Sequence, residues 1–521
     1  IENSDIRAIQ FLSENKSFTP DLKYLKGLKE SNTEDVDMEV YEQMIGEIES
    51  NQLSFKVTSQ EQKHIQSLEK GKILKYILYR YVFKEYPRKK ISTKFPIYIL
   101  IEQVSSCNLK CGMCFQSDAT FIKKEFMGKM DINLYKKWAS GGAGILLSGN
   151  VQVDKRYLEG PGNVAIEKET YLDQIDNLRK WAEVGTRNNT QFWMQISHAG
   201  RQTPGAINPN PLSPSSVQLK IPGANYGIPT PMSVDDIEDV IQRFIFVAKI
   251  AKETGFTGIQ LHAAHGYLLS QFLSPDINLR DDEWGGSITN RSRLMLRIIE
   301  GCRAELGNNF PIAVKLNSAD FQKGGFSDSD SIKVAKLLDD AGVDVIEISG
   351  GTYEQPRLLG LDDVSVNKER SEERKPSTIA REAYFLNYAE KIQKAIKTPL
   401  MVTGGFRTSV AMNAALNAKA CDLIGVGRPL CAQPLILNDL LAGSIQELPS
   451  YEKTLQIGRW WLSPHSPFLI IQALNAFSQQ AWFYIQIKRM GDNLAPNLKL
   501  PIFKAYKENK KLEKVMIKEL S

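Results

Sequence analysis

The sequence lacks several features that mark large classes of protein. Six cysteines and five histidines among 521 residues are too few for a scaffold held together by disulfides. No apolar run reaches the ~18 residues that span a membrane, since Gln472 and Asn475 already interrupt the longest one, Pro467 to Ile487. Lysine and arginine number 65 against 60 acidic residues, and a net charge of +5 gives no general attraction to nucleic acid. We therefore expect neither a membrane span nor a nucleic-acid partner.

The beginning of the chain carries no visible secretory signal. It reads Ile-Glu-Asn-Ser, without a basic flank followed by an apolar stretch. Hydrophobic residues make up 42% and charged residues 24%, which is ordinary for globular proteins. We expect a cytoplasmic protein, long enough for two domains.

The sequence predicts a helical leader over residues 1–94. Residues 37–50 place Met38, Met44 and Ile48 on one helical face. A second helix is expected over residues 73–86, ending at Pro87. Packing on its own domain is the common use of such apolar faces, and a membrane surface or partner is the alternative.

From residue 96 onward, short apolar strands alternate with amphipathic helices. One helix begins at a capping box of Ser233 and Asp236, and another is expected over residues 328–340. Strands this rich in Val, Ile and Leu are typical of buried parallel sheets. We expect an α/β fold, a TIM (β/α)8 barrel, with strands at residues 97–104, 143–148, 191–197, 257–263, 311–317, 343–349, 399–403 and 422–427.

The last segment, residues 450–521, predicts a helical arm rich in aromatic residues such as Trp460 and Trp482. We expect it to pack on the barrel or on a second subunit, which leaves a homo-oligomer open. A substrate lid is a third interpretation.

Chemistry in such barrels lies on the loops that follow the strands. His262 and His265 stand three residues apart at a strand end, and Tyr267 follows two residues later. Two hydrogen-bond donors beside an acid suit the polarisation of a carbonyl and protonation of its α-carbon. The alternatives are structural histidines or two metal ligands, although a third ligand cannot be placed.

Glycine-rich tetrads follow the last two strands. Gly404-Gly-Phe-Arg407 comes after the seventh strand and Gly425-Val-Gly-Arg428 after the eighth. Loops at these two places commonly cradle a phosphate with backbone N–H groups. Each tetrad alone could be a simple turn, so the prediction of a phosphate site depends on their occurrence after two neighbouring strands.

Several long motifs follow one another along the chain. They are Trp193-Met-Gln-Ile-Ser-His-Ala-Gly-Arg201, His262-Ala-Ala-His-Gly-Tyr-Leu-Leu-Ser-Gln-Phe-Leu-Ser-Pro275 and Arg280-Asp-Asp-Glu-Trp-Gly-Gly-Ser-Ile-Thr-Asn-Arg291. Together with Glu347-Ile-Ser-Gly-Gly351 and the two glycine tetrads, they resemble the old yellow enzyme family of FMN-dependent oxidoreductases. The resemblance covers residue 139 to the C-terminus, and we assign residues 139–449 to this FMN-binding barrel.

The resemblance implies roles for residues around the flavin. Gln195 would hydrogen-bond the pyrimidine edge of FMN, and Lys315 would stand by flavin N1, where a cation stabilises the anionic reduced ring. Arg291 is expected to tie loops together. The phosphate would be held by the main chain of Gly405 and Phe406, with Gly427 and the Arg428 side chain.

The resemblance also implies a reaction. NAD(P)H would reduce FMN, and hydride would then pass to the β-carbon of an activated alkene, such as an α,β-unsaturated carbonyl compound. His262 and His265 would bind the carbonyl or nitro oxygen, and Tyr267 would be the proton donor. The first hypothesis is therefore an ene-reductase type of NAD(P)H oxidoreductase.

A different resemblance covers residues 95–138. Cys107, Cys111 and Cys114 follow the first predicted strand with the Cys-x3-Cys-x2-Cys spacing of the radical SAM superfamily. Three such thiolates hold a [4Fe–4S] cluster in that superfamily. A zinc loop or three buried thiols are the alternatives.

The Gly-Gly-Glu motif that would bind S-adenosylmethionine is absent, so no complete site for it can be assembled. The second hypothesis is nevertheless a radical SAM enzyme, and the third is a non-functional fusion of two barrel fragments. If the cysteine loop lies on the flavin face of the barrel, a cluster there could feed electrons to FMN.

Overall fold

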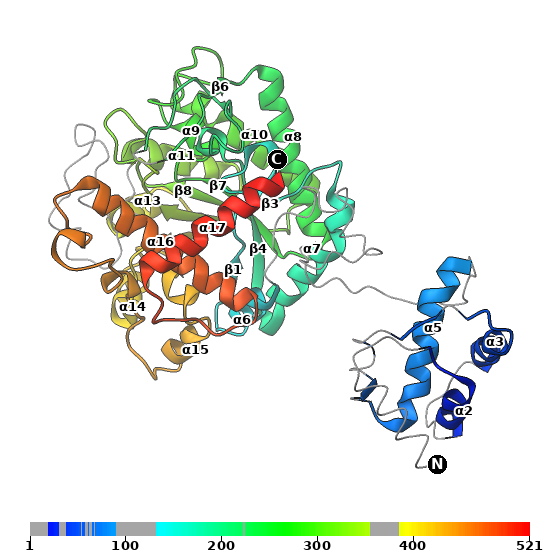
Figure 1. Cartoon of the computed structure of the whole chain (residues 1–521). Helices are drawn as coiled ribbons and strands as arrows, with labels where there is room; N and C mark the ends of the chain where they lie inside the picture. Colours follow the sequence, from blue (N-terminus) through cyan, green and yellow to red (C-terminus); the bar gives the residue numbers. More distant parts are fainter. Residues whose placement is uncertain are drawn as a thin grey trace. The chain divides into compact units, whose positions relative to one another are not determined.

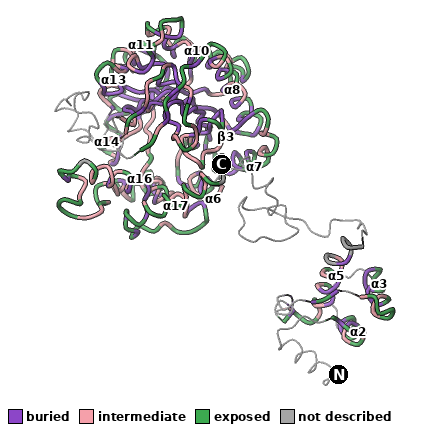
Figure 2. Tube along the Cα trace, turned by 45° about the horizontal axis from the view of Figure 1, so that its top comes forward, coloured by how far each residue is buried: buried purple, intermediate pink, exposed green. Residues whose placement is uncertain are grey.

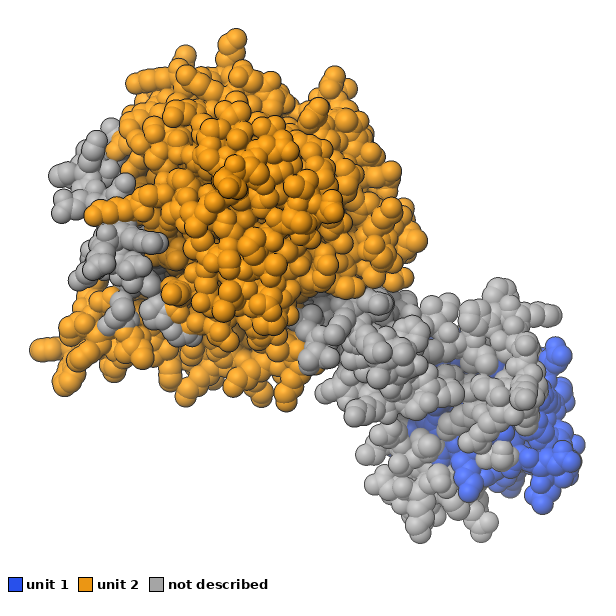
Figure 3. Space-filling view, turned by 90° about the horizontal axis from the view of Figure 1, so that it is seen from above, with its two compact units in different colours: residues 1–107 blue, residues 108–521 orange. Residues whose placement is uncertain are grey.

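The chain divides into two compact units, residues 1–107 and 108–521 (Figure 3). The four-part division from the sequence, with boundaries at residues 94, 138 and 449, stays a prediction. The computed structural model describes residues 19–30, 38–53, 55–57, 61, 65–66, 68–89, 132–221, 224–354 and 385–520.

The N-terminal unit is built from helices, as the sequence predicts. Its helices α2 (Leu22–Glu30), α3 (Met38–Glu49) and α5 (Ile73–Lys89) contact one another. They share an apolar core that includes Leu25, Met44, Phe55, Ile77 and Tyr81. The amphipathic faces are therefore used for packing within the unit.

The predicted end of the second leader helix is wrong. Helix α5 continues through Pro87 to Lys89. Proline removes one backbone N–H and disfavours a helical conformation in the residue before it, but position 87 lies in the last turn, where only two more residues follow in the helix.

The C-terminal unit is organised around parallel strands that helices surround (Figure 1). Each neighbouring pair is parallel, and the strands follow one another in chain order. These strands are β1 (Ile145–Leu147), β4 (Gln191–Ser197), β7 (Gly258–Ala263), β8 (Ile312–Asn317), β9 (Val345–Ser349), β10 (Leu400–Thr403) and β11 (Leu423–Gly425).

The strand order confirms the predicted (β/α) barrel architecture. Two-residue strands β2 (Val151–Gln152) and β3 (Val164–Ala165) bring the sheet to nine strands among the described residues. Because β1 and β2 pair with successive parts of β4, they act as one interrupted barrel strand. The predicted first strand, residues 97–104, lies outside the described residues.

Helices cover the outside of the strands and bury a large apolar core between the two layers (Figure 2). The capping box of Ser233 and Asp236 is present at the start of α8, and α11 spans the predicted residues. The covering helices are α7 (Tyr171–Gly185), α8 (Val234–Glu253), α9 (Leu268–Leu273), α10 (Ile288–Leu306), α11 (Asp328–Asp340), α13 (Leu386–Gln393), α14 (Ser409–Asn417) and α15 (Ile436–Leu441).

The inside of the barrel is filled in levels. Trp193, Ala313, Val345 and Met401 form a separate apolar cluster on the inward faces of four strands. Gly258 completes this level, because a Cβ there would stand 2.6 Å from the Trp193 ring. Side chains two residues further along a strand point to the same side. The next inward level is therefore formed by residues 195, 260, 315 and 347.

The C-terminal arm packs on the barrel unit. Its helices α16 (Leu469–Gly491) and α17 (Ile502–Leu520) contact each other, and α16 contacts α6 (Ile132–Ala139). Asn133 and Lys137 of α6 donate hydrogen bonds to carbonyls at the end of α16. Trp482 is fully buried at the centre of the arm's own apolar core.

Candidate active site

A row of hydrogen-bonded polar side chains crosses the inside of the barrel, one level further along the strands than the apolar cluster. Gln195 Nε2 donates to Gln260 Oε1 at 2.6 Å, and Gln260 Nε2 donates to Glu347 Oε2 at 2.7 Å. Lys315 Nζ donates to the other oxygen of Glu347 at 2.6 Å. The predicted flavin residues Gln195 and Lys315 are thus part of one hydrogen-bonded network.

The third inward level carries Ser197, His262, Asn317 and Ser349 at the strand ends. His262 is 4% exposed, and its Nδ1 accepts a hydrogen bond from the backbone N–H of Ala264 at 3.3 Å. A neutral imidazole that accepts at Nδ1 carries its proton on Nε2. This N–H is the group that His262 can offer to a substrate oxygen.

A tight turn brings the second histidine beside the first. His265 has a φ of 58° and Gly266 a φ of 81°, so two successive residues adopt the left-handed conformation. The backbone N–H of His265 donates to Asn317 Oδ1, and Gln202 Nε2 donates to the His265 carbonyl at 2.7 Å. These bonds from neighbouring loops hold a conformation that is unfavourable for a histidine.

The predicted trio comes together in space. The ring centroid of His262 lies 5.1 Å from that of His265 and 4.6 Å from that of Tyr267. Nε2 of His265 is 2.7 Å from Ser349 Oγ, which orients the ring. Residues from two loops therefore surround one small region at the strand ends.

Burial keeps both imidazoles neutral. Burial and then the charge of Lys315 lower the pKa of His265 to about 3. Burial, followed by the charges of His265 and Lys315, also places the pKa of His262 well below its usual value. Neutral histidines can polarise a carbonyl by hydrogen bonding, without giving up a proton.

Tyr267 is the acidic group of the trio. It is 4% exposed, and its hydroxyl lies 3.0 Å from the hydroxyl of Tyr353. Burial and then the Glu159 carboxylate raise the pKa of Tyr267 well above its usual value. The phenol therefore stays protonated at neutral pH, as a proton donor must.

The two glycine tetrads lie side by side, because β10 and β11 pair as far as Thr403 and Gly425. Gly404 and Gly405 have φ values of 129° and 93°, which side chains rarely tolerate. Phe406 is 1% exposed, so only its main chain can face a ligand.

The charges beside these loops are partly compensated. Arg407 donates to Glu452 Oε1 at 2.6 Å, and Arg428 lies 3.6 Å from the same oxygen. Two guanidinium groups therefore lie close to one carboxylate beside Gly427. A Cβ at Gly427 would meet no atom within 4 Å. The two guanidinium groups, the free space at Gly427 and the glycines at positive φ are together suited to binding a phosphate.

The residues present fit FMN. An amide at Gln195 and a cation at Lys315 lie inside the barrel, while the glycine loops lie at the ends of the next strands. Lys315 has three N–H donors and gives one to Glu347 in the described part of the chain. The donor set therefore matches a ring system with a polar edge and a phosphate tail.

The structure also shows the contacts of Arg291 and of three site residues that were not predicted. Arg291 donates to the carbonyls of Gly286 and Leu273, which confirms that it ties loops together. Three further side chains belong to the site without having been predicted: Gln260, Glu347 and Tyr353. For Gln260 and Glu347 a signal existed, since each is a polar residue inside an otherwise apolar strand.

The predicted cluster ligands Cys107, Cys111 and Cys114 lie outside the described residues. Within residues that are described, no group of three or more His, Cys, Asp or Glu side chains could hold a metal ion. None of the helices in that same part is long and apolar enough to cross a membrane.

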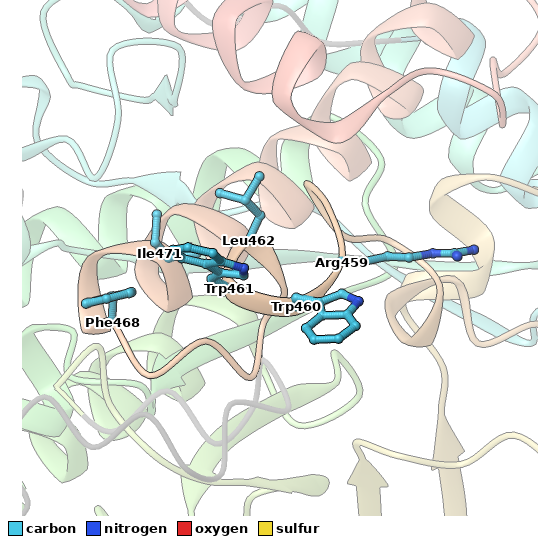
Figure 4. A pocket seen from close by; sticks show the side chains of 6 residues that line it. All are labelled: Arg459, Trp460, Trp461, Leu462, Phe468 and Ile471. Atoms are coloured by element: carbon cyan, nitrogen blue, oxygen red, sulfur yellow. The ribbon is translucent and has the colours of Figure 1, made fainter.

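A separate hollow of about 540 Å³ lies on the arm (Figure 4). Trp460 is 83% exposed and Trp461 70% exposed at its rim. Apart from Arg459, its lining side chains are apolar or aromatic. The lining residues are Arg459, Trp460, Trp461, Leu462, Phe468 and Ile471.

This fold and site define a flavin-dependent oxidoreductase. Residues 111–444 match the NADH:flavin oxidoreductase / NADH oxidase family, and the chain belongs to that family. The match begins 28 residues before the predicted boundary at residue 139, so it includes Cys111 and Cys114. Nothing in the match supports a radical SAM site or an iron–sulfur cluster in that segment.

Named fungal relatives agree with this family. The chain is 35% identical over 371 residues to the NADH-dependent flavin oxidoreductase iccE of Talaromyces variabilis, covering 67% of this chain and 86% of that protein. It is 34% identical over 347 residues to the NADH-dependent flavin oxidoreductase nadA of Aspergillus parasiticus, covering 65% and 75%. The chain is therefore an oxidoreductase of the old yellow enzyme type.

Solved structures share the fold. A 2-naphthoyl-CoA reductase complex has a TM-score of 0.54 and 26% identity, covering 62% of this chain and 48% of that one. The old yellow enzyme homologue from Zymomonas mobilis has a TM-score of 0.50 and 21% identity, covering 63% and 87%. The latter supports the barrel architecture alone.

Proposed function

We propose that this chain uses FMN and NADH to reduce an alkene that is conjugated to a carbonyl or nitro group. The observation that carries the proposal is the convergence of two neutral histidines and one protonated phenol at the strand ends. Bound FMN would accept hydride from NADH and deliver it to the β-carbon of the acceptor.

The chain's own residues have separable tasks in this proposal. His262 and His265 hydrogen-bond the acceptor oxygen, which draws electrons from the alkene. Tyr267 then gives its proton to the α-carbon. Since both imidazoles are neutral, the phenol is the acid of the trio.

The proposed FMN site uses the remaining predicted residues. Gln195 contacts the pyrimidine edge, and Lys315 holds a positive charge beside it. The phosphate is bound by the main chain of Gly405, Phe406 and Gly427 and by the Arg428 side chain. Identification of FMN released from the purified protein tests this assignment.

Substitution of Tyr267→Phe tests the proton donor. We expect the reduction of cyclohexenone to slow by at least ~100-fold, the lower bound for losing a general acid. Reduction of the flavin by NADH should keep its wild-type rate, because that step needs no proton from Tyr267. Anaerobic stopped-flow absorbance follows the two half-reactions separately.

A matched control is Tyr171→Phe, a tyrosine of α7 that packs on Phe246 outside the site. It should leave both half-reactions unchanged. Equal loss of both rates in Tyr267→Phe, or no loss in either, would refute the role of Tyr267 as proton donor.

The radical SAM alternative is not proposed as a second function, because no described residue or comparison favours it. Whether Cys107, Cys111 and Cys114 hold a cluster stays a prediction. Iron and sulfide analysis of protein purified without oxygen tests it.

A further inference from the structure

Two further residues connect Tyr267 to the edge of the site. The Tyr267 and Tyr353 hydroxyls lie 3.0 Å apart, and the Tyr353 hydroxyl donates to Glu159 Oε1 at 2.7 Å. Asn150 Nδ2 donates to the other oxygen of Glu159 at 2.7 Å and fixes the carboxylate. The three side chains form a continuous hydrogen-bonded line.

Exposure differs along this line. Tyr267 is buried, whereas Tyr353 and Glu159 are half-buried and reach solvent. Tyr267 must regain a proton after each turnover if it protonates the acceptor. When an acceptor is bound against the two histidines, the hydrogen bonds through Tyr353 still connect the buried Tyr267 hydroxyl to the partly exposed Glu159 carboxylate.

Phenols surround the carboxylate from several elements. Burial and then Glu159 raise the pKa of Tyr484, on arm helix α16, to about 12. The same two causes raise the pKa of Tyr226 to about 12. The Glu159 carboxylate also raises the pKa of Tyr353 and Tyr267, after burial. Because each of these pKa values is raised, the four phenols stay protonated at neutral pH.

We propose that Tyr353 and Glu159 are positioning residues that return a proton from solvent to Tyr267 between turnovers. This inference rests on the proposed function, in which Tyr267 is the proton donor.

The proton balance closes over one cycle. The O–H bond of Tyr267 breaks as the C–H bond at the α-carbon forms, which leaves a phenolate. Water or buffer first protonates the Glu159 carboxylate. Tyr353 then gives its proton to the Tyr267 phenolate and receives the proton of Glu159, which returns to a carboxylate. One proton moves from solvent to product, and no electrons pass along this route.

Substitution of Tyr353→Phe removes the middle hydroxyl. When the reduced holoenzyme is mixed with cyclohexenone, the first turnover uses a Tyr267 that is already protonated. We expect its rate to stay within ~2-fold of wild type, whereas steady-state kcat falls at least ~10-fold, a modest part of what general acids contribute. A merely structural role would slow both rates together.

Glu159→Gln provides an independent variant. Glutamine keeps the shape and can still bond Tyr353, but it cannot carry a proton. The same split between first turnover and steady state is expected. In Glu159→Ala, added formate should restore steady-state kcat, because a small carboxylic acid can take the vacated place.

The control is Tyr484→Phe, which alters a phenol near Glu159 that is not part of the line. It should leave both rates unchanged. The inference is overturned if steady-state kcat in Tyr353→Phe and Glu159→Gln equals wild type, or if the first turnover falls equally, while Tyr267→Phe still blocks alkene reduction. If the wild-type holoenzyme reduces no enone, the proposed function itself fails and the relay falls with it.

Discussion

Lys315 and Glu347 place opposite charges inside the barrel with little access to water. Their side chains are 11% and 1% exposed, and the N–O distance is 2.6 Å. An ion pair removed from water needs its remaining hydrogen bonds satisfied. Gln260 supplies one of these to Glu347. The charge beside the proposed flavin ring is therefore a cation that a carboxylate partly neutralises.

Substitution of Glu347→Gln should raise the midpoint potential of bound FMN. The full charge of Lys315 would then act on the reduced ring, which is anionic. We expect a rise of at least ~30 mV, which for a two-electron couple corresponds to about 1.4 kcal/mol. Spectroelectrochemical titration of the holoenzyme measures it.

Glu238→Gln is the control for this potential, because it removes a carboxylate that pairs with Arg297 at the surface. It should leave the potential unchanged. An unchanged or lower potential in Glu347→Gln would contradict the view that Glu347 offsets the charge of Lys315.

The turn between β7 and α9 shows how a short element positions the histidines. A Cβ at Gly266 would stand 2.4 Å from Gln202 Nε2, the group that holds the His265 carbonyl. The Gln202 side chain is buried, so it has little room to move. The turn and its neighbouring loop therefore depend on a residue without a side chain at position 266.

Gly266→Ala should lower the free energy of unfolding by about 2–3 kcal/mol. The left-handed backbone contributes about 1–2 kcal/mol of this and the displaced Gln202 hydrogen bond about 1 more. Urea unfolding followed by tryptophan fluorescence measures the loss. Reduction of enones should also slow, because His265 would move.

Gly342→Ala separates the two causes. Gly342 has a φ of 70°, close to that of Gly266, but a Cβ there meets no atom within 4 Å. We expect a loss of only about 1–2 kcal/mol from the backbone conformation. Equal losses at the two positions would mean that the contact with Gln202 does not matter.

The elements differ in how far the sequence predicts them. Strand β7 and helix α11 carry enough apolar residues to be located within one residue. Strands β2 and β3 have two residues each and show no periodicity. The trio around His262 is predictable because short spacing places it at one strand end. Glu159 and Tyr353 are 194 residues apart, and no local pattern connects them.

For the molecule as a whole, buried neutral histidines make stability depend on pH. Burial lowers the pKa of His198 to about 4, and His265 and His262 are shifted in the same direction. Above pH ~6.5 these groups are neutral in both the folded and the unfolded chain. Below it the unfolded chain gains protons that the folded chain does not bind.

The free energy of unfolding should therefore fall as the pH drops from 7 to 5. Each of the three histidines contributes a loss of about 2 kcal/mol at pH 5, from 1.36 kcal/mol per pH unit below ~6.5. His198→Asn should flatten this dependence, since asparagine can accept the Gly200 N–H that His198 Nδ1 accepts at 3.0 Å. Urea midpoints at the two pH values measure the slope.

The exposed His465 supplies the control. His465→Gln should keep the wild-type slope between pH 7 and pH 5. A slope in His198→Asn that also equals wild type would show that protonation of His198 in the unfolded chain does not destabilise the fold.

The hydrogen bond that joins Glu159 to Tyr353 also bears on how this protein folds. Its partners are separated by 194 residues, and α6 reaches α16 across 358. Contacts between such distant residues form slowly, because a long loop must close before they add any stability. A partly folded barrel can contain the turn at His262 but not the hydrogen bonds from Tyr267 through Tyr353 to Glu159. Recovery of sustained turnover after refolding would thus be a late event that reports closure of the whole chain.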